Sequence, residues 1–79
     1  MAELQTTLHD IAAAIVDTPD AVTVTREEDE TTITLTLSVA PEDMGMVIGR
    51  HGRIAKAIRT VMKAAAAECG KRVNVEIRD

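Results

Sequence analysis

The turn Gly49-Arg50-His51-Gly52 is the part of this 79-residue sequence whose residue types and spacing best suit a chemical task. Two glycines separated by two residues let the backbone pass close to a ligand, because glycine has no Cβ and accepts positive φ angles. A helix that follows such a turn directs free N–H groups toward it, which favours a bound phosphate. Arg50 and Arg53 add positive charge. The pattern therefore predicts a place where a phosphodiester backbone can lie.

Other kinds of chemistry have less support in the sequence. The P-loop pattern G-x-x-x-x-G-K-[ST] is absent. The spacing of His9, His51 and Cys69 is not that of metal ligands, so we expect neither a metal nor a cofactor. No side chain lies in a recognisable nucleophile motif, and we expect no enzymatic activity. Cys69 is expected to be a small, buried apolar residue.

Charge is distributed unevenly along the chain. The net charge is −4, yet residues 1–43 carry ten acidic side chains and one basic side chain, whereas residues 44–79 carry eight basic and three acidic ones. Residues 45–67 contain five basic side chains and no acidic one, and the glycine turn lies among them. Such asymmetry marks an interaction surface. It predicts a one-sided, salt-sensitive contact with a polyanion.

Composition excludes several classes of protein. The sequence has no Phe, Trp or Tyr, so it lacks the stacking platforms of many RNA-binding folds. No apolar run approaches the ~20 residues needed to span a membrane. Residues 1–5 lack the basic and apolar segments of a secretory signal. We therefore expect a cytoplasmic protein without a membrane partner.

Hydrophobic periodicity predicts the elements that position the turn. Apolar residues at a spacing of three to four predict a helix from Leu4 that ends before Pro19. Alternating residues then predict a hairpin over 21–39 with one apolar and one threonine face. A short helix begins at Pro41, where Glu42 and Asp43 suit the positive end of the helix dipole.

A longer helix over residues 53–68 and a strand over 73–77 complete the chain. On a helical wheel, six apolar residues share one side of the long helix and are expected to face the core: Ile54, Ile58, Val61, Met62, Ala65 and Cys69. The order α-β-β-α-α-β predicts that the second and last strands are parallel neighbours. We expect an α+β two-layer sandwich with a three-stranded mixed sheet, formed by one domain over residues 1–79.

The segment Val47-Ile-Gly-Arg-His-Gly52 resembles the V-I-G-x-x-G core of KH domains, whose GXXG loop clamps about four nucleotides. The element order resembles the type II KH fold. Residues 52–59, Gly-Arg-Ile-Ala-Lys-Ala-Ile-Arg, resemble a stretch of the small bacterial single-KH-domain proteins of the KhpA family. The resemblance implies a non-catalytic protein that holds short single-stranded RNA, as an RNA chaperone or post-transcriptional regulator.

The same resemblance implies which residues bind. The loop itself and residues around it are expected to contact RNA: Gly49, Arg50, His51, Gly52, Arg53, Lys56, Ile48 and Ile54. Residues 72–74 would begin the opposite wall of the groove. Arg59 and Lys63 are expected to lie on a solvated helix face.

A second interpretation is a protein-interaction adaptor in which the loop and neighbouring helices form a dimer interface. A site that reads about four nucleotides needs a second site for useful affinity. For this reason, too, we expect a homodimer or a heterodimer with another KH-containing protein.

Overall fold

Polar residues alternating with apolar ones form the sheet, as the sequence predicts. The computed structural model describes residues 4–79 and has strands β1 (Thr23–Glu28), β2 (Thr32–Ser38) and β3 (Arg72–Arg78) in the order β1-β2-β3. β1 is antiparallel to β2, and β2 is parallel to β3. The mixed sheet and the parallel pair confirm the predicted topology.

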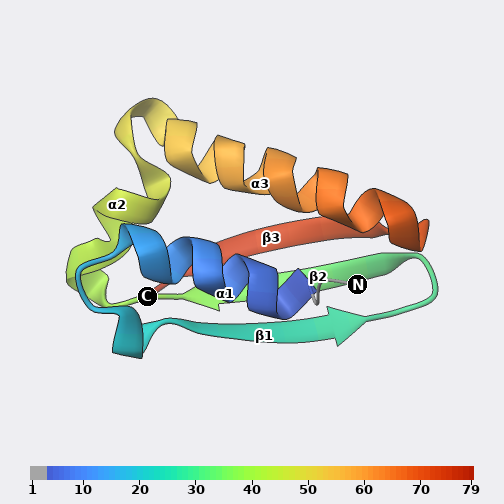
Figure 1. Cartoon of the computed structure of the whole chain (residues 1–79), viewed down its shortest axis with the longest axis horizontal. Helices are drawn as coiled ribbons and strands as arrows, with labels where there is room; N and C mark the ends of the chain where they lie inside the picture. Colours follow the sequence, from blue (N-terminus) through green and yellow to red (C-terminus); the bar gives the residue numbers. More distant parts are fainter. Residues whose placement is uncertain (1–3) are drawn as a thin grey trace.

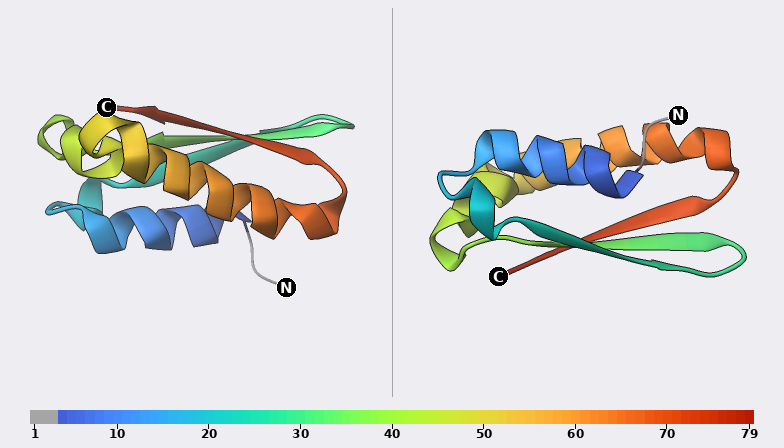
Figure 2. Two further views of the ribbon diagram at one scale, coloured as in Figure 1. Left: turned by 90° about the horizontal axis from the view of Figure 1, so that it is seen from above. Right: turned by 60° about the horizontal axis from the view of Figure 1, so that its bottom comes forward.

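Helices cover one face of this sheet (Figures 1 and 2). They are α1 (Leu4–Ile15), α2 (Met44–Ile48) and α3 (Arg53–Ala66), and α1 and α3 cross the sheet in opposite directions. The order of the helices and strands confirms the α+β two-layer sandwich with α-β-β-α-α-β connectivity, which is consistent with a type II KH-like fold. The other face of the sheet has no helix over it in residues 4–79 (Figure 2).

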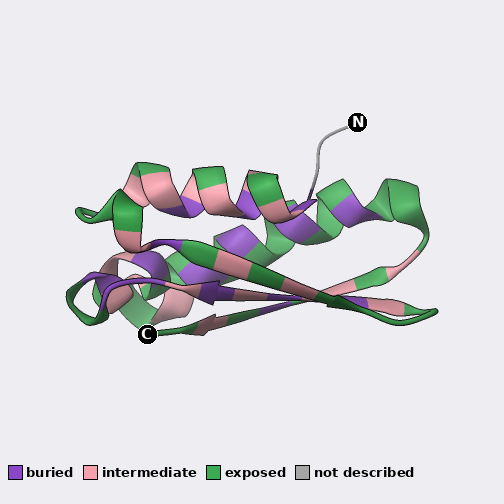
Figure 3. Cartoon of the chain, turned by 90° about the horizontal axis from the view of Figure 1, so that it is seen from below, coloured by how far each residue is buried: buried purple, intermediate pink, exposed green. Residues whose placement is uncertain are grey.

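The core lies between the helices and the sheet (Figure 3). Leu35 and Leu37 of β2, Leu8 of α1 and Met62 of α3 are all fully buried. Leu35 pairs in register with Val75 of β3, which is also buried, so the apolar sides of adjacent strands form one surface. Burial of a large aliphatic side chain stabilises a fold by about 1.5–3 kcal/mol, and these residues therefore hold the two layers together.

The buried side of α3 differs from the predicted one. Ile58 and Met62 are buried as expected, but Ile54 and Val61 are 38% and 50% exposed. The other buried positions are two alanines, Ala55 and Ala66. Small side chains at these two positions let this side of the helix approach its neighbours closely, whereas Ile54 and Val61 lie on the exposed side. The prediction that Ile54, Val61 and Ala65 face the core was wrong, because a helical wheel shows the apolar side of a helix but not how closely the helix approaches its neighbours.

The end of α3 also differs from the prediction. The α-helix stops at Ala66, and Ala67–Cys69 forms a turn of 3₁₀ helix before Gly70, which has a φ of 70°. A 3₁₀ turn has three residues per turn instead of 3.6, so it rotates its side chains away from the helical stripe. Cys69 is consequently exposed, and the prediction that it is buried was wrong.

Residues 1–3 lie outside the described range. The expectation that residues 1–5 lack a secretory signal falls partly on these residues. In residues 4–79, no helix has the length and hydropathy required to cross a membrane.

Candidate functional site

The loop between α2 and α3 lies at one end of the molecule, and the β1–β2 turn lies at the other (Figures 1 and 2). Gly49 has φ 75° and ψ 173°, and Gly52 has φ 73° and ψ 15°. Both values lie where glycine is strongly preferred. The N–H of Gly52 donates to the carbonyl of Gly49 at 3.1 Å, which closes the turn. The backbone at both positions of the motif thus favours glycine.

His51 is the one non-glycine residue in the described chain with a positive φ, 58°. A left-handed conformation costs an ordinary residue about 1–2 kcal/mol. Such strain persists where the surroundings impose it and is concentrated at functional sites. His51 lies between two glycines that also have positive φ angles, and Arg50 and His51 are both exposed.

Cations surround the loop. Arg50, Arg53 and Lys56 are exposed, and Arg53 and Lys56 lie three residues apart on the first turn of α3. No side chain caps the N-terminus of α3. The first N–H groups of a helix carry partial positive charge, which adds to the field of the three side chains. The loop thus lies in a positive environment that suits a phosphate.

Apolar side chains lie beside these cations. Three large apolar residues are exposed in residues 4–79, and two of them flank the loop: Ile48 is 37% and Ile54 is 38% exposed. Val47, the residue before Ile48, is fully buried. The structure therefore brings all eight sequence-predicted residues to one end of the molecule, with apolar and cationic groups side by side.

Sequence reasoning missed the role of Asp43, which it treated as a partner of the helix dipole. Its side chain is buried, and Oδ2 accepts the N–H of Thr18 at 3.0 Å. This hydrogen bond joins the segment after α1 to the start of α2, which leads directly into the loop. The partner is 25 residues away in the sequence, so no local pattern could have revealed it.

Residues 72–74 do not lie beside the loop. Arg72, Val73 and Asn74 line a groove together with residues from the second half of α3. None of the loop residues lines this groove. The strand predicted to form the opposite wall therefore begins far from the glycine turn, because β3 and α3 run in opposite directions (Figure 1).

No group of three or more potential metal ligands occurs in the part of the chain that the structure describes.

The sequence of this chain matches that of a known protein family. The family model for the KH domain of KhpA and KhpB matches residues 5–77. The chain belongs to this family. The KhpA/KhpB membership confirms both the resemblance seen in the sequence and the expectation that the chain is not an enzyme, since its relatives are named as RNA-binding proteins.

Two relatives illustrate the similarity to KhpA. RNA-binding protein KhpA of Clostridium acetobutylicum is 61% identical over 70 residues, which cover 89% of this chain and 93% of the relative. RNA-binding protein KhpA of Halalkalibacterium halodurans is 46% identical over 76 residues, which cover 96% of this chain and all of the relative.

Solved structures share the fold of the KhpA/KhpB domain. Era of Aquifex aeolicus, bound to GDP·AlF4⁻, superposes with a TM-score of 0.74 at 13% identity. Era in complex with MgGDPNP and nucleotides 1506–1542 of 16S ribosomal RNA gives a TM-score of 0.71 at 16% identity. Each match covers 95% of this chain and less than a third of the Era chain.

Proposed function

We propose that residues 1–79 form a single KH-like domain that holds short single-stranded RNA through Gly49-Arg50-His51-Gly52, without catalysing a reaction. The observation that carries the proposal is the exposed turn between two positive-φ glycines, next to exposed cations and two exposed isoleucines. Family membership supports it, since relatives carry the name RNA-binding protein KhpA.

Each part of the site has a role in this proposal. The two glycines let the RNA backbone approach the loop, and Arg50, His51 and Arg53 contact its phosphates. Lys56 extends the positive charge along α3. Ile48 and Ile54 contact the faces or edges of bases, which needs no aromatic side chain. Phosphate contacts carry no sequence information, so we expect low sequence specificity.

The biological role follows from weak, unspecific binding. A protein of this kind acts as an RNA chaperone or a post-transcriptional regulator, and we propose a cytoplasmic location. It requires no cofactor. A second RNA site on a partner would raise the overall affinity by orders of magnitude through effective concentration.

Titration of the isotope-labelled protein with an eight-nucleotide oligouridylate tests the site. The amide resonances of residues 48–56 are expected to shift most, and those of the β1–β2 turn least. Shifts confined to other surfaces, or no shifts at low salt, would refute the assignment of the loop.

A second candidate function rests on the outward side of α3. Val61 is 50% exposed and lies two turns after Ile54, with exposed Ala57 between them on the same side of the helix. This apolar strip is the reason to propose a homodimer, or a heterodimer with another KH-containing protein. If the chain binds no RNA, this alternative makes it a protein-interaction adaptor whose loop and neighbouring helices contact another protein.

A further inference from the structure

The glycine turn contains one residue of the type that changes its charge between pH 5 and pH 8, the histidine at position 51. His51 is exposed and follows Arg50, and both lie between glycines with positive φ angles. Neither ring nitrogen of His51 has a hydrogen-bond or ion-pair partner in the part of the chain that the structure describes. Both nitrogens are therefore available to a ligand of the loop.

The elements that pack against the turn bring cations to His51. α2 carries no titratable side chain, and α3 begins with Arg53 and Lys56, which are both exposed. The acidic residues before α2 are Glu42, which is exposed, and Asp43, which is buried in the fold. No carboxylate in residues 4–79 forms an ion pair with His51. A phosphate at the loop therefore meets the imidazole ring without a competing anion bound to it.

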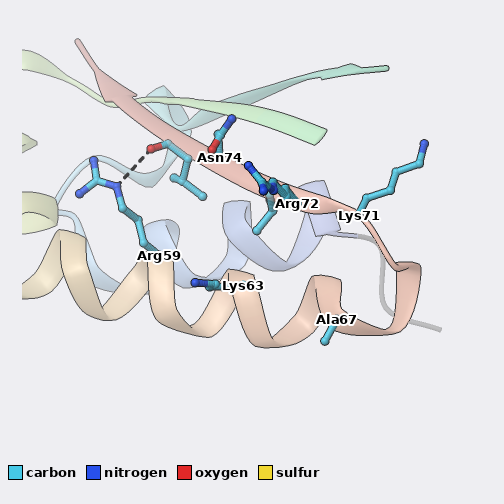
Figure 4. A pocket seen from close by; sticks show the side chains of 8 residues that line it. Arg59, Lys63, Ala67, Lys71, Arg72 and Asn74 are labelled. Atoms are coloured by element: carbon cyan, nitrogen blue, oxygen red, sulfur yellow. Dashed lines mark hydrogen bonds between the residues drawn. The ribbon is translucent and has the colours of Figure 1, made fainter. Parts of the chain in front are cut away.

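The other cations of α3 lie farther from the turn. The Nε of Arg59 donates to the carbonyl of Val75 at 3.2 Å, and Lys63 lies one helical turn further on (Figure 4). Arginine and lysine side chains carry their charge throughout the range from pH 5 to pH 8. They attract RNA equally over this range, so a change in attraction points to a histidine. The chain has two histidines, His9 and His51.

Protonation changes what the ring of His51 offers to a phosphate. A neutral imidazole has one N–H donor and one acceptor nitrogen, whereas an imidazolium has two donors and a positive charge. A hydrogen bond with an ionised donor is about twice as strong as one between neutral groups. The acceptor nitrogen of the neutral ring gains nothing from a phosphodiester, which has no proton to donate. The protonated ring is thus the form that suits the RNA backbone.

We propose that protonation of His51 makes RNA binding pH-sensitive, so that the loop binds the backbone of single-stranded RNA more tightly at mildly acidic pH. The inference rests on the proposed RNA-binding function and adds a means of regulating the same site. A ligand that prefers the protonated protein also favours its protonation, because the coupling is reciprocal. RNA binding near neutral pH is therefore accompanied by proton uptake.

Fluorescence anisotropy with an eight-nucleotide oligouridylate at pH 5.5 and pH 8.0, in 50 mM salt, tests the proposal. Uracil bases keep one protonation state over this range, so the RNA itself does not titrate. The wild type is expected to bind about fivefold more tightly at pH 5.5. His51→Asn stays neutral and tolerates the left-handed backbone, and it should bind equally at both pH values. His51→Lys stays charged, and it should also bind equally at both but more tightly than His51→Asn.

The matched control is His9→Asn. It removes the other histidine, which lies on α1 with its Nδ1 3.3 Å from the carboxylate of Asp10. This variant should keep the fivefold difference between the two pH values. Calorimetry at pH 6.5 in two buffers of different ionisation enthalpy gives a second readout, in which the wild type takes up protons on binding and His51→Asn does not.

The outcomes separate this inference from the proposed function. Equal binding by the wild type at both pH values, or a pH dependence that survives in His51→Asn, overturns the role of His51 in regulation and leaves the loop site intact. Failure of the wild type to bind the RNA at either pH overturns both proposals.

Discussion

Gly49 lies directly against Ile54: a Cβ added to the glycine would come within 2.8 Å of the Cβ of Ile54 and 3.0 Å of its backbone nitrogen. The loop therefore closes onto the first turn of α3 with no room for a side chain. This contact places the exposed isoleucine beside the exposed turn at 50–51. The apolar and the cationic parts of the proposed RNA site are fixed relative to each other as a result.

The two glycines of the loop are predicted to differ in their tolerance of alanine. Gly49 combines φ 75° with ψ 173°, a region essentially restricted to glycine, and has no space for a Cβ. Gly52 has a left-handed φ of 73°, but nothing lies within 4 Å of the added Cβ. We expect Gly52→Ala to lower the free energy of unfolding by about 1–2 kcal/mol and Gly49→Ala to lower it by more. Urea denaturation measures both, and equal losses would contradict the close approach to Ile54.

Asp43 is predicted to stabilise the fold through its hydrogen bond to the N–H of Thr18. Asp43→Ala removes the acceptor and leaves a cavity, and we expect a loss of about 1–3 kcal/mol in the free energy of unfolding. Asp43→Asn keeps a carbonyl oxygen in place and should lose less. Hydrogen exchange at the amide of Thr18 should accelerate in Asp43→Ala. An unchanged exchange rate would show that this hydrogen bond does not hold the segment.

The link between Glu28 and Lys71 is predicted to make stability sensitive to acid. Hydrogen bonds from Lys71 and then Arg26 lower the pKa of Glu28 below its ordinary value of 4.5. A carboxyl group with a lowered pKa in the folded state stabilises it fully above about pH 4.5. That stabilisation is lost as the pH falls through the lowered pKa.

The variant Glu28→Gln should therefore lose less stability than the wild type between pH 7 and pH 3, as measured by urea denaturation. Glu27→Gln is the matched control, because it removes the same charge from the next residue without touching the ion pair to Lys71. An identical pH dependence in Glu28→Gln and the wild type would refute a contribution from this pair.

Val61 is predicted to contribute to self-association if α3 forms a dimer interface. The side chain is half exposed, and a charge at this position would be buried without a partner in a dimer. Val61→Glu should thus shift the mass measured by sedimentation equilibrium from dimer to monomer. The position faces solvent in one chain alone, so the fold should remain. A wild-type protein that stays monomeric at high concentration would refute the proposed homodimer.

The helices and strands and their order could be predicted from the sequence, because apolar residues recur with a clear helical or strand periodicity in each of them. Alternation over β2 predicted a strand with one buried side, and Leu35 and Leu37 are indeed buried. The connection through two helices predicted the parallel pairing of β2 and β3. The two glycines of the loop were expected to let the backbone pass close to a ligand, and both have positive φ angles.

Contacts between distant segments could not be predicted in the same way. The rotation of α3 depends on how closely Ala55 and Ala66 approach the rest of the core, which hydropathy does not measure. The hydrogen bond from Arg59 to Val75 joins residues 16 apart across a loop. Arg59 and Lys63 are exposed, as expected, but the groove that they line together with residues of β3 depends on this arrangement and cannot be seen from each element by itself.

The measurement that tests the central claim most directly is RNA binding by the variant Arg50→Asp/His51→Asp. Aspartate accepts left-handed backbone better than most residues, so the turn at residue 51 should keep its shape. Arg78→Asp, at the exposed last position of β3 and outside the loop, is the control for a reversed charge. We predict that the loop variant keeps its circular dichroism spectrum and oligomeric state but loses binding to an eight-nucleotide oligouridylate, while Arg78→Asp retains it. Undiminished binding by the folded loop variant would contradict the claim that Gly49–Gly52 holds the RNA.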